Sequence, residues 1–271
     1  MKRKGIVLAG GNGTRLYPLT KAINKQLLPV FDKPMIYYPI STLMLLGIRD
    51  ILLISRIQDL ETYKKLLGNG QQWGIDINYS IQESPNGLAE SFIIGREFLK
   101  NDPSVLILGD NIFYGDSFSS KLEDINNSKK GCYILGYPVK DAKRYGVIEF
   151  NNEGKVIAIE EKPNNPKSRY AVTGLYFYDN SVTDRVKSLR PSNRGELEIT
   201  DLNNLYLKDN LLNVKLLGQG TAWFDAGTHE SLHEASSFIR TVENRQDMKI
   251  GCPEEISWRN GWISKDDLTK L

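Results

Sequence analysis

The stretch "GIVLAGGNGTRLYPLT", residues 5–20, joins a short apolar run to a glycine-rich turn and then to an arginine. A run this short, bounded by glycines, is typical of a buried strand. Gly10, Gly11 and Gly13 lack a Cβ, so the backbone N–H groups of the turn can approach a bulky anion and point at it. Arg15 adds a guanidinium group, which can hold two phosphate oxygens at once. The stretch therefore predicts a strand followed by a phosphate-binding loop.

Neither common phosphate-binding motif describes this loop. The pattern G-x-G-x-x-G fits Gly11 and Gly13 but fails at Leu16, and the P-loop pattern fails at Arg15 and Leu16. The loop alone leaves open an ordinary βα turn with a solvated arginine. Local charge favours the anion site, because residues 1–49 contain eight Lys or Arg and one acidic residue, a net charge of +7.

The order of apolar runs along the chain predicts an α/β fold. Strand-like runs and helical patterns alternate in the first 110 residues, with the strands at 5–10, 50–55, 77–82 and 104–110 and the helices at 39–48, 60–68 and 88–100. Such alternation indicates a Rossmann-like, mostly parallel sheet flanked by helices. Ligands bind such sheets at the carboxyl ends of the strands, and Asp110 follows one of these ends, in "LILGD".

The second half has a different pattern. Several strand-like runs follow one another between residues 132 and 179, which predicts an inserted, partly antiparallel region. Helical patterns at 182–189 and 197–209, a strand at 212–218, and a helical C-terminus that starts with a long helix at about 229–245 complete the chain. We expect residues 1–271 to form a single domain.

Composition excludes several classes of protein. The 271 residues contain 35 Lys or Arg and 33 Asp or Glu, a net charge of +2, which supplies no general field for nucleic acid or an anionic membrane. The N-terminal apolar run is too short for a signal peptide, and no run approaches the length of a membrane span. Two widely separated cysteines favour a reducing compartment. We expect a cytoplasmic protein with neither a nucleic-acid nor a membrane partner.

One motif points to a different chemistry. "HESLH", residues 229–233, fits the H-E-x-x-H pattern of zinc proteases. The extended pattern requires Gly and His where this chain has Ser236 and Ile239, and the chain contains no third histidine. Thr228 also has the character of a helix N-cap, which places His229 at a helix end. We therefore reject zinc hydrolysis.

A set of segments in order along nearly the whole chain resembles the sugar-1-phosphate nucleotidylyltransferases, and within that family the glucose-1-phosphate thymidylyltransferases. The segments include "LAGGNGTRLYPLT", "KQLLPVFDKPMIYYPISTLM", "QESPNGLAES", "LGDNIFYGD", "RYGVIEF", "EEKP", "YAVTGLYFYD", "RGELEITD" and "CPEEISWRNG". The resemblance implies Mg²⁺-dependent transfer of a thymidylyl group from dTTP to glucose 1-phosphate. The products would be dTDP-glucose and pyrophosphate, in the first step of dTDP-rhamnose or deoxysugar synthesis.

The implied chemistry needs no protein nucleophile. A phosphomonoester is largely dianionic at neutral pH, so its own oxygen can attack the α-phosphorus in line. The protein has to bring two anions together and stabilise the departing pyrophosphate. Two alternatives stay open: the same reaction with UTP, whose base has the same pairing edge, and a sensor that binds sugar nucleotides without turnover.

The resemblance assigns roles to individual residues. Arg15, Lys25 and Asp110 are the expected catalytic residues, and Asp110 and Asp225 the expected Mg²⁺ ligands. Residues 1–115 are expected to bind the nucleotide, through Leu8, Gly10, Gly11, Gly13, Thr14, Arg15, Lys25, Gln26, Gln82, Gly87 and Asp110. Residues 116–228 are expected to complete the sugar-phosphate site, which consists of Asn111, Tyr145, Gly146, Glu161, Lys162 and Val172. Residues 229–271 form the expected helical C-terminal segment.

The resemblance also implies a second, regulatory nucleotide site and a homotetramer. The expected regulatory residues are Tyr114, Gly115, Ser119, Glu255, Ile256 and Arg259. Asp116 departs from the histidine usual in the family after "NIFYG", and it places a negative charge beside this site.

Overall fold

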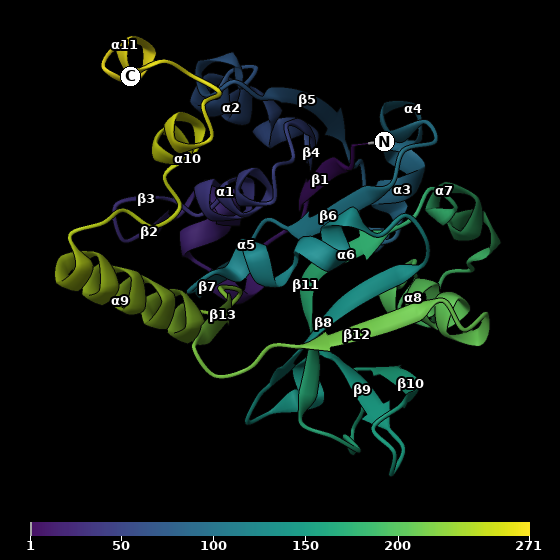
Figure 1. Cartoon of the computed structure of the whole chain (residues 1–271). Helices are drawn as coiled ribbons and strands as arrows, with labels where there is room; N and C mark the ends of the chain where they lie inside the picture. Colours follow the sequence, from purple (N-terminus) through teal and green to yellow (C-terminus); the bar gives the residue numbers. More distant parts are fainter. Residues whose placement is uncertain (1) are drawn as a thin grey trace.

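The computed structural model describes residues 2–271, which surround a nine-stranded sheet (Figure 1). The strand order is β10-β9-β11-β6-β1-β4-β5, and β8 joins β11 to β12. These strands are β1 (Lys4–Ala9), β4 (Asp50–Ser55), β5 (Asp76–Ile81), β6 (Ser104–Leu108), β8 (Cys132–Pro138), β9 (Gly146–Phe150), β10 (Val156–Glu161), β11 (Tyr170–Tyr178) and β12 (Leu212–Leu216).

The parallel half of the sheet confirms the predicted Rossmann-like α/β class. Strand β1 pairs in parallel with β4 on one side and with β6 on the other, and β5 extends the sheet beyond β4. Alternate side chains of β1 enter different cores: Val7 and Ala9 belong to one buried cluster, Ile6 and Leu8 to another. A strand buried on both faces explains why its sequence is apolar without alternation.

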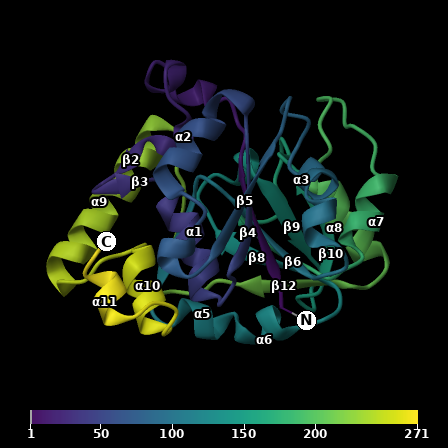
Figure 2. The ribbon, with the colours of Figure 1, turned by 90° about the horizontal axis from the view of Figure 1, so that it is seen from above.

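Helices cover both faces of the sheet, as Figure 2 shows. One face packs against α1 (Tyr37–Leu45), α2 (Ile57–Leu67), α5 (Phe118–Lys121), α6 (Glu123–Asn127) and α10 (Pro253–Arg259). The other packs against α3 (Glu90–Ile94), α4 (Arg96–Leu99), α7 (Val182–Arg185) and α8 (Ile199–Lys208). The helix predicted at 88–100 is interrupted at Gly95, where a Cβ would lie 2.9 Å from the Ser91 carbonyl oxygen and 3.1 Å from Ile6.

The predicted antiparallel region is centred on β11. This strand pairs antiparallel with β6, β8 and β9, while β12 pairs in parallel with β8. Both halves of the chain therefore contribute strands to one sheet. Within the described part of the chain, residues 2–271, six 3-10 helices occupy connecting segments: η1 (Thr14–Leu16), η2 (Leu19–Lys21), η3 (Lys25–Leu27), η4 (Gln71–Trp73), η5 (Ala142–Arg144) and η6 (Val186–Ser188).

Two small sheets and the C-terminal helices complete the described residues. Strand β7 (Asn111–Gly115), which the sequence analysis did not predict, pairs antiparallel with β13 (Thr221–Asp225), so that Asp225 faces Asn111. A hairpin of β2 (Pro29–Val30) and β3 (Lys33–Pro34) packs near α9 (His229–Gln246). Thr228 caps α9 as predicted, and α11 (Lys265–Leu268) is the last helix. Within residues 2–271, every helix is too short or too polar to cross a membrane.

Candidate active site

Two adjoining cavities open at the carboxyl ends of β1 and β6. Cavity A, of about 180 Å³, is lined by Leu8, Gly11, Lys25, Gln26, Gln82, Pro85, Gly87, Leu88, Leu108, Asp110 and Glu196. Cavity B, of about 260 Å³, is lined among others by Arg15, Asn111, Tyr145, Gly146, Glu161, Lys162, Val172 and Asp225. Four residues line both cavities: Leu88, Leu108, Asp110 and Glu196. Two ligands seated in the cavities would therefore meet at Asp110.

The structure brings nearly all of the predicted site residues to these cavities. Of the predicted catalytic, nucleotide-binding, sugar-phosphate-binding and metal residues, all of them within residues 2–271, only Gly10, Gly13 and Thr14 line neither cavity. Gly10 still packs against cavity A, because a Cβ there would collide with Gln82. Gly13 lies in the left-handed region at φ +63°, and a Cβ there would lie 3.3 Å from the Lys25 Cβ. The two glycines thus shape the loop beside the cavity, as their lack of a Cβ permits.

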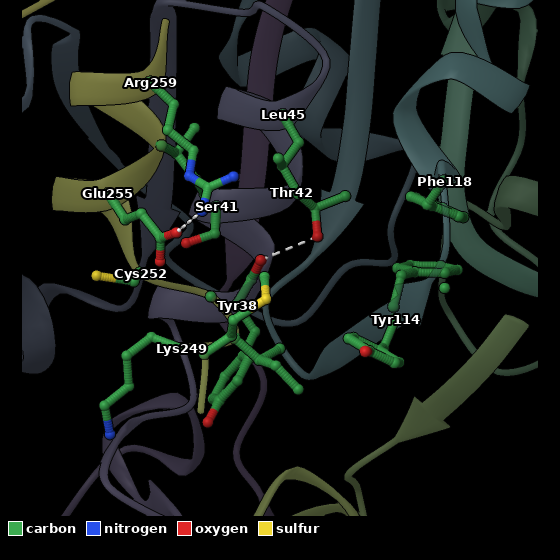
Figure 3. A pocket seen from close by; sticks show the side chains of 16 residues that line it. Tyr38, Ser41, Thr42, Leu45, Tyr114, Phe118, Lys249, Cys252, Glu255 and Arg259 are labelled. Atoms are coloured by element: carbon green, nitrogen blue, oxygen red, sulfur yellow. Dashed lines mark hydrogen bonds and ion pairs between the residues drawn. The ribbon is translucent and has the colours of Figure 1, made fainter. Parts of the chain in front are cut away.

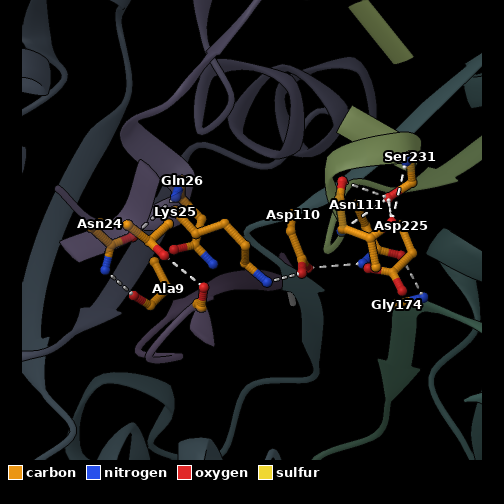
Figure 4. A network of polar contacts seen from close by, with 12 residues as sticks. Ala9, Asn24, Lys25, Gln26, Asp110, Asn111, Gly174, Asp225 and Ser231 are labelled. Carbon is orange, nitrogen blue, oxygen red and sulfur yellow. Dashed lines mark hydrogen bonds and ion pairs between the residues drawn. The ribbon is translucent and has the colours of Figure 1, made fainter. Parts of the chain in front are cut away.

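The wall between the cavities contains an ion pair of Lys25 and Asp110 (Figure 4). Both side chains are largely buried, with 14% and 13% of their surface exposed. Burial acts to raise the pKa of Asp110, but the charge and hydrogen bond of Lys25 and the amide of Asn111 outweigh it and hold that pKa below its ordinary value. Asp110 is therefore a carboxylate at neutral pH.

The pKa of Asp225 is shifted in the opposite direction. Burial, followed by repulsion from the Asp110 carboxylate, raises the pKa of Asp225 to about 6. A Cβ on Gly227 would lie 2.9 Å from Asp225 Oδ1 and 3.7 Å from Asp110 Oδ2, so the two carboxylates border one small space that glycine leaves open. Two hard oxygen donors that repel each other fit a divalent cation such as Mg²⁺. Asp110 and Asp225 are the residues that would hold it.

Asp225→Asn is expected to stabilise the metal-free protein at neutral pH. Because the folded-state pKa lies above the ordinary 3.8, the carboxyl favours folding below about pH 4, and that contribution is lost as the pH rises through about 6. This pKa difference corresponds to a loss of at most about 3 kcal/mol of folding free energy at neutral pH. The neutral amide of the variant does not incur this loss. Thermal melts without divalent ions should give the variant a higher Tm at pH 7, by several degrees, and a smaller gain at pH 4. A lower Tm at pH 7 than the parent would contradict the assignment.

Asn111 holds Asp110 from the side opposite Lys25. Its Nδ2 donates to Asp110 Oδ1 at 3.1 Å, while its Oδ1 accepts from the Gly174 N–H at 2.9 Å and from Trp223 Nε1 at 2.6 Å. The side chain is 2% exposed. A Cβ on Gly174 would lie 2.5 Å from the Asn111 amide, so only glycine permits this contact. Asn111 was predicted as a sugar-phosphate residue, and the structure adds this second role to its place on the wall of cavity B.

The far wall of cavity B combines carboxylates with cations. Glu161 accepts a hydrogen bond from Thr200 Oγ1 at 2.6 Å and lies 3.4 Å from both Lys162 Nζ and Arg194 Nη2. Lys162 adopts φ +45°, in the left-handed region that few non-glycine residues enter. Carboxylate oxygens can accept bonds from sugar hydroxyls, and the two cations can bind a phosphate.

Sequence reasoning missed several residues of this wall. Arg194, Glu198 and Thr200 lie in "RGELEIT", a segment recognised as part of the family resemblance but given no role. Arg194 makes a two-pronged contact with Glu198, with Nη2 at 2.8 and 2.7 Å from the two carboxylate oxygens. The charge density of the segment was the available signal. Trp223, whose ring lies 5.3 Å from that of Tyr145, was also missed because an isolated aromatic residue has no distinctive spacing.

Arg15, which was predicted to bind the nucleotide, lies on η1 and lines cavity B and not cavity A, so it borders the nucleotide cavity from the neighbouring one. Its side chain stays available for a ligand. Within residues 2–271, no carboxylate lies within ion-pair distance of its guanidinium group. Arg3 is a useful contrast, since its buried guanidinium donates to backbone carbonyls that include those of Tyr178 and Ile125. An arginine without a protein partner, at the mouth of a cavity, suits an incoming anion.

A third cavity, here called cavity C, lies between α1, β7 and the segment from 248 to 259 (Figure 3). Five predicted regulatory residues line it: Tyr114, Gly115, Glu255, Ile256 and Arg259. Ser119 does not, because it lines a neighbouring groove with Leu45 and Gly47, so that one member of the predicted set lies apart. Glu255 and Arg259 form an ion pair of 2.7 Å, and the Ser41 hydroxyl is buried without a partner among the described residues.

The zinc-like pattern does not form a metal site in the structure. His229, Glu230 and His233 are exposed on the first turns of α9. Among residues 2–271, no group of three or more His, Cys, Asp or Glu side chains is placed to hold a metal ion. The structure therefore gives the motif no third ligand.

Comparison with known proteins identifies the class of this protein. The Nucleotidyl transferase family pattern matches residues 4–242, and the chain belongs to that family. Several relatives are named glucose-1-phosphate thymidylyltransferase. The one from Neisseria meningitidis serogroup A is 58% identical over 268 residues, 99% of this chain and 93% of the relative. The one from Mycobacterium tuberculosis is 50% identical over 267 residues, 98% and 92% of the two chains.

Solved structures agree with the family assignment. A crystal structure from Bacillus anthracis, described as a glucose-1-phosphate thymidylyltransferase in complex with sucrose, has a TM-score of 0.82 and 45% identity, and the match covers 88% of this chain and 95% of that one. A UDP-glucose pyrophosphorylase complexed with UDP-glucose has a TM-score of 0.75 at 24% identity, with 89% and 100% coverage, which shows a shared fold. The resemblance noted in the sequence is confirmed.

Proposed function

We propose that this nucleotidyltransferase moves a thymidylyl group from dTTP to glucose 1-phosphate and releases dTDP-glucose and pyrophosphate, as the first step of dTDP-rhamnose or deoxysugar synthesis. The single observation behind the proposal is that cavities A and B share Asp110, with Lys25 on the side of cavity A and Lys162 on the side of cavity B. A nucleotide in cavity A and a sugar phosphate in cavity B would meet at this wall.

The side chains supply positioning and charge. The phosphate oxygen of glucose 1-phosphate attacks the α-phosphorus of dTTP, a new P–O bond forms, and the bond to the β-phosphate breaks as pyrophosphate leaves with its electron pair. Lys25 neutralises charge near the α-phosphate, Arg15 neutralises the pyrophosphate, and Lys162 with Arg194 holds the sugar phosphate. Gln82 presents its amide to the pyrimidine edge, and Glu161 accepts hydrogen bonds from sugar hydroxyls.

We propose that Mg²⁺ is the metal at Asp110 and Asp225. When bound, the ion would withdraw charge from phosphate oxygens as a Lewis acid. Asp110 stays ionised for this role because Lys25 and Asn111 lower its pKa. Asp225, which is half protonated near pH 6 without metal, would release a proton when a cation binds.

Steady-state kinetics across nucleotides test the proposed function. Pyrophosphate release is measured with glucose 1-phosphate and dTTP, UTP, ATP, CTP or GTP in turn. We expect the highest kcat/KM with dTTP, because the relatives are named thymidylyltransferases, and only a modestly lower one with UTP, because both bases offer Gln82 the same pairing edge. A higher kcat/KM with UTP would favour the uridylyltransferase alternative. Absence of release with all five nucleotides would favour the sensor.

We further propose that cavity C is a regulatory site for a sugar nucleotide and that the protein is a cytoplasmic homotetramer of single-domain chains. The cavity is separate from cavities A and B, and two cations border it: Arg259, which pairs with Glu255, and Lys249, which pairs with Asp32 and Glu243. A diphosphate would take over these contacts. Strands from both halves share one sheet, which supports a single domain, and both cysteines are free thiols, which supports a reducing compartment. Inhibition by dTDP-rhamnose should persist when both substrates are saturating. Purely competitive inhibition would contradict the regulatory site, and monomers in light scattering would contradict the tetramer.

A further inference from the structure

A buried amide lies behind the catalytic lysine. Asn24, which is fully buried, directly precedes Lys25 and uses all of its side-chain hydrogen-bonding groups. Its Oδ1 accepts from the Gln26 N–H at 3.0 Å and from the Tyr63 hydroxyl at 2.9 Å. Its Nδ2 donates to Asp59 Oδ2 at 2.7 Å and to the Ala9 carbonyl at 3.3 Å. Such a fully satisfied amide holds a single orientation.

Two of these bonds join the backbone segments that form cavity A. The bond from the Gln26 N–H caps η3, the short helix on which Lys25 lies. The bond to the Ala9 carbonyl fastens the same amide to the last residue of β1, where the glycine loop begins. Figure 4 shows Asn24 and Ala9 on one side of Lys25, with Asp110 on the other. Asn24 therefore fixes the position of Lys25 relative to the glycine loop.

The other two hydrogen bonds of the Asn24 side chain are made with Asp59 and Tyr63 of α2, a helix that lies outside the site. Asp59 also accepts from Arg56 Nε at 2.7 Å, and Arg56 Nη1 lies 3.4 Å from Asn12 Oδ1 in the glycine loop. Tyr63 is fully buried, and burial, with the charge of Asp59, raises its pKa, so its hydroxyl stays a donor. None of Arg56, Asp59 and Tyr63 lines cavity A or cavity B among the described residues.

We propose that Asn24, Asp59 and Tyr63 are positioning residues that fix the Lys25 ammonium against Asp110 and thereby set the rate of nucleotidyl transfer. The inference rests on the proposed function. It assigns α2 a part in the reaction although this helix touches no ligand cavity. Gln82 and Arg15 make none of the contacts of this network, so the base and the departing pyrophosphate should still be held when the network is weakened. The network also fastens the glycine loop through Ala9 and Asn12, and we expect this to change KM less than the displacement of Lys25 changes kcat. A displacement of about 1 Å at a catalytic group can cost about a hundredfold in rate.

The mildest test is Tyr63→Phe, which removes one hydroxyl and leaves the ring. We expect kcat to fall three- to tenfold, with KM for dTTP and glucose 1-phosphate unchanged within twofold. The matched control is Tyr206→Phe, which removes another buried hydroxyl, bonded to Asp179 at 2.9 Å and remote from Lys25. This control should lower the Tm and leave kcat unchanged. Equal kcat values for the parent and Tyr63→Phe would overturn the proposal.

A charge exchange provides a sharper test. Asn24→Asp sets one carboxylate against that of Asp59, and we expect about a hundredfold loss in kcat. Adding Asp59→Asn restores an amide and carboxylate pair with reversed direction, so that the carboxylate introduced at position 24 again accepts from the Gln26 N–H and from Tyr63. The bond to the Ala9 carbonyl stays lost, so the recovery is partial. We expect the double variant to recover at least tenfold in kcat over Asn24→Asp. Recovery of Tm without recovery of kcat, or a loss confined to KM, would overturn the proposal.

The outcomes separate this inference from the proposed function. The kinetics use the nucleotide that the parent turns over best, so a preference for UTP would refute thymidylyl transfer and still allow the network to be tested. A parent that turns over no nucleotide would overturn both. If Asn24→Asp fails to fold, Tyr63→Phe against its Tyr206→Phe control decides the question.

Discussion

Asp110→Asn is expected to lower kcat for thymidylyl transfer about a thousandfold. The substitution removes the acceptor of Lys25 and one of the two proposed Mg²⁺ ligands, while it leaves the shape of the side chain almost unchanged. Removing a single electrostatic contact to the transition state costs about 10²–10³ in kcat, and Asp110 both pairs with Lys25 and is one of the proposed metal ligands. The loss should appear in kcat at saturating substrates, because Asp110 lies on the wall where the two ligands meet.

The control for this variant is Asp102→Asn. Asp102 also pairs with a lysine, Lys4 at 3.1 Å, but at the amino ends of β1 and β6, the edge of the sheet opposite the cavities. We expect its kcat to stay within twofold of the parent. Asp110→Asn with more than a tenth of the parental kcat, at saturating Mg²⁺ and both substrates, would contradict the proposed role.

Arg15→Ala is expected to lower kcat/KM for dTTP by about 10²–10³. Removing one charged donor from a transition-state oxygen has an effect of this size, and an exposed side chain without a protein partner contributes little to folding. Pyrophosphate release at subsaturating dTTP measures the loss, and thermal melts should show an unchanged Tm. Arg15→Lys should recover about tenfold, since an ammonium keeps the charge but not the two-pronged geometry.

Lys21→Ala tests whether Arg15 acts through a specific contact with the nucleotide or only through the positive charge that it adds to its segment. Lys21 lies in the same basic segment as Arg15 but lines neither cavity A nor cavity B. Its removal takes away the same charge, and kcat/KM should fall less than threefold because salt screens exposed charges. Similar losses for Arg15→Ala and Lys21→Ala would refute a direct contact of Arg15 with the nucleotide.

Local patterns were sufficient to predict most of the elements. The runs at 50–55 and 104–110 became β4 and β6 because a strand buried on both faces has to be apolar throughout. Strand β7 was not predicted, because "NIFYG" has no alternation and follows β6 after only two residues. Gly95 interrupts a regular helical pattern because the chain approaches Ile6 there, a contact that no local pattern indicates.

The residues of the candidate site fall into the same two groups, those with a local sequence signature and those that depend on contacts between distant segments. Arg15, Lys25 and Asp110 could be proposed from the sequence, because a glycine loop, nearby cations and a strand end with a carboxylate have local signatures. The role of Asn24 could not be proposed, since it depends on Asp59 and Tyr63, which are 35 and 39 residues away. Arg194 was overlooked for the same reason, because its contact with Glu161 spans 33 residues.

The sequence by itself determined the α/β class, the glycine-rich loop that follows the first strand, and the family to which the chain belongs. Only the tertiary structure decided that β13 pairs with β7 and so brings Asp225 to Asp110, and that cavities A and B meet at a wall that contains Asp110. The physical reason is the distance along the chain over which each kind of interaction acts. Hydrophobic periodicity and turn chemistry act over a few residues, whereas the charges that shift the pKa values of Asp110 and Asp225 come from segments that only folding brings together.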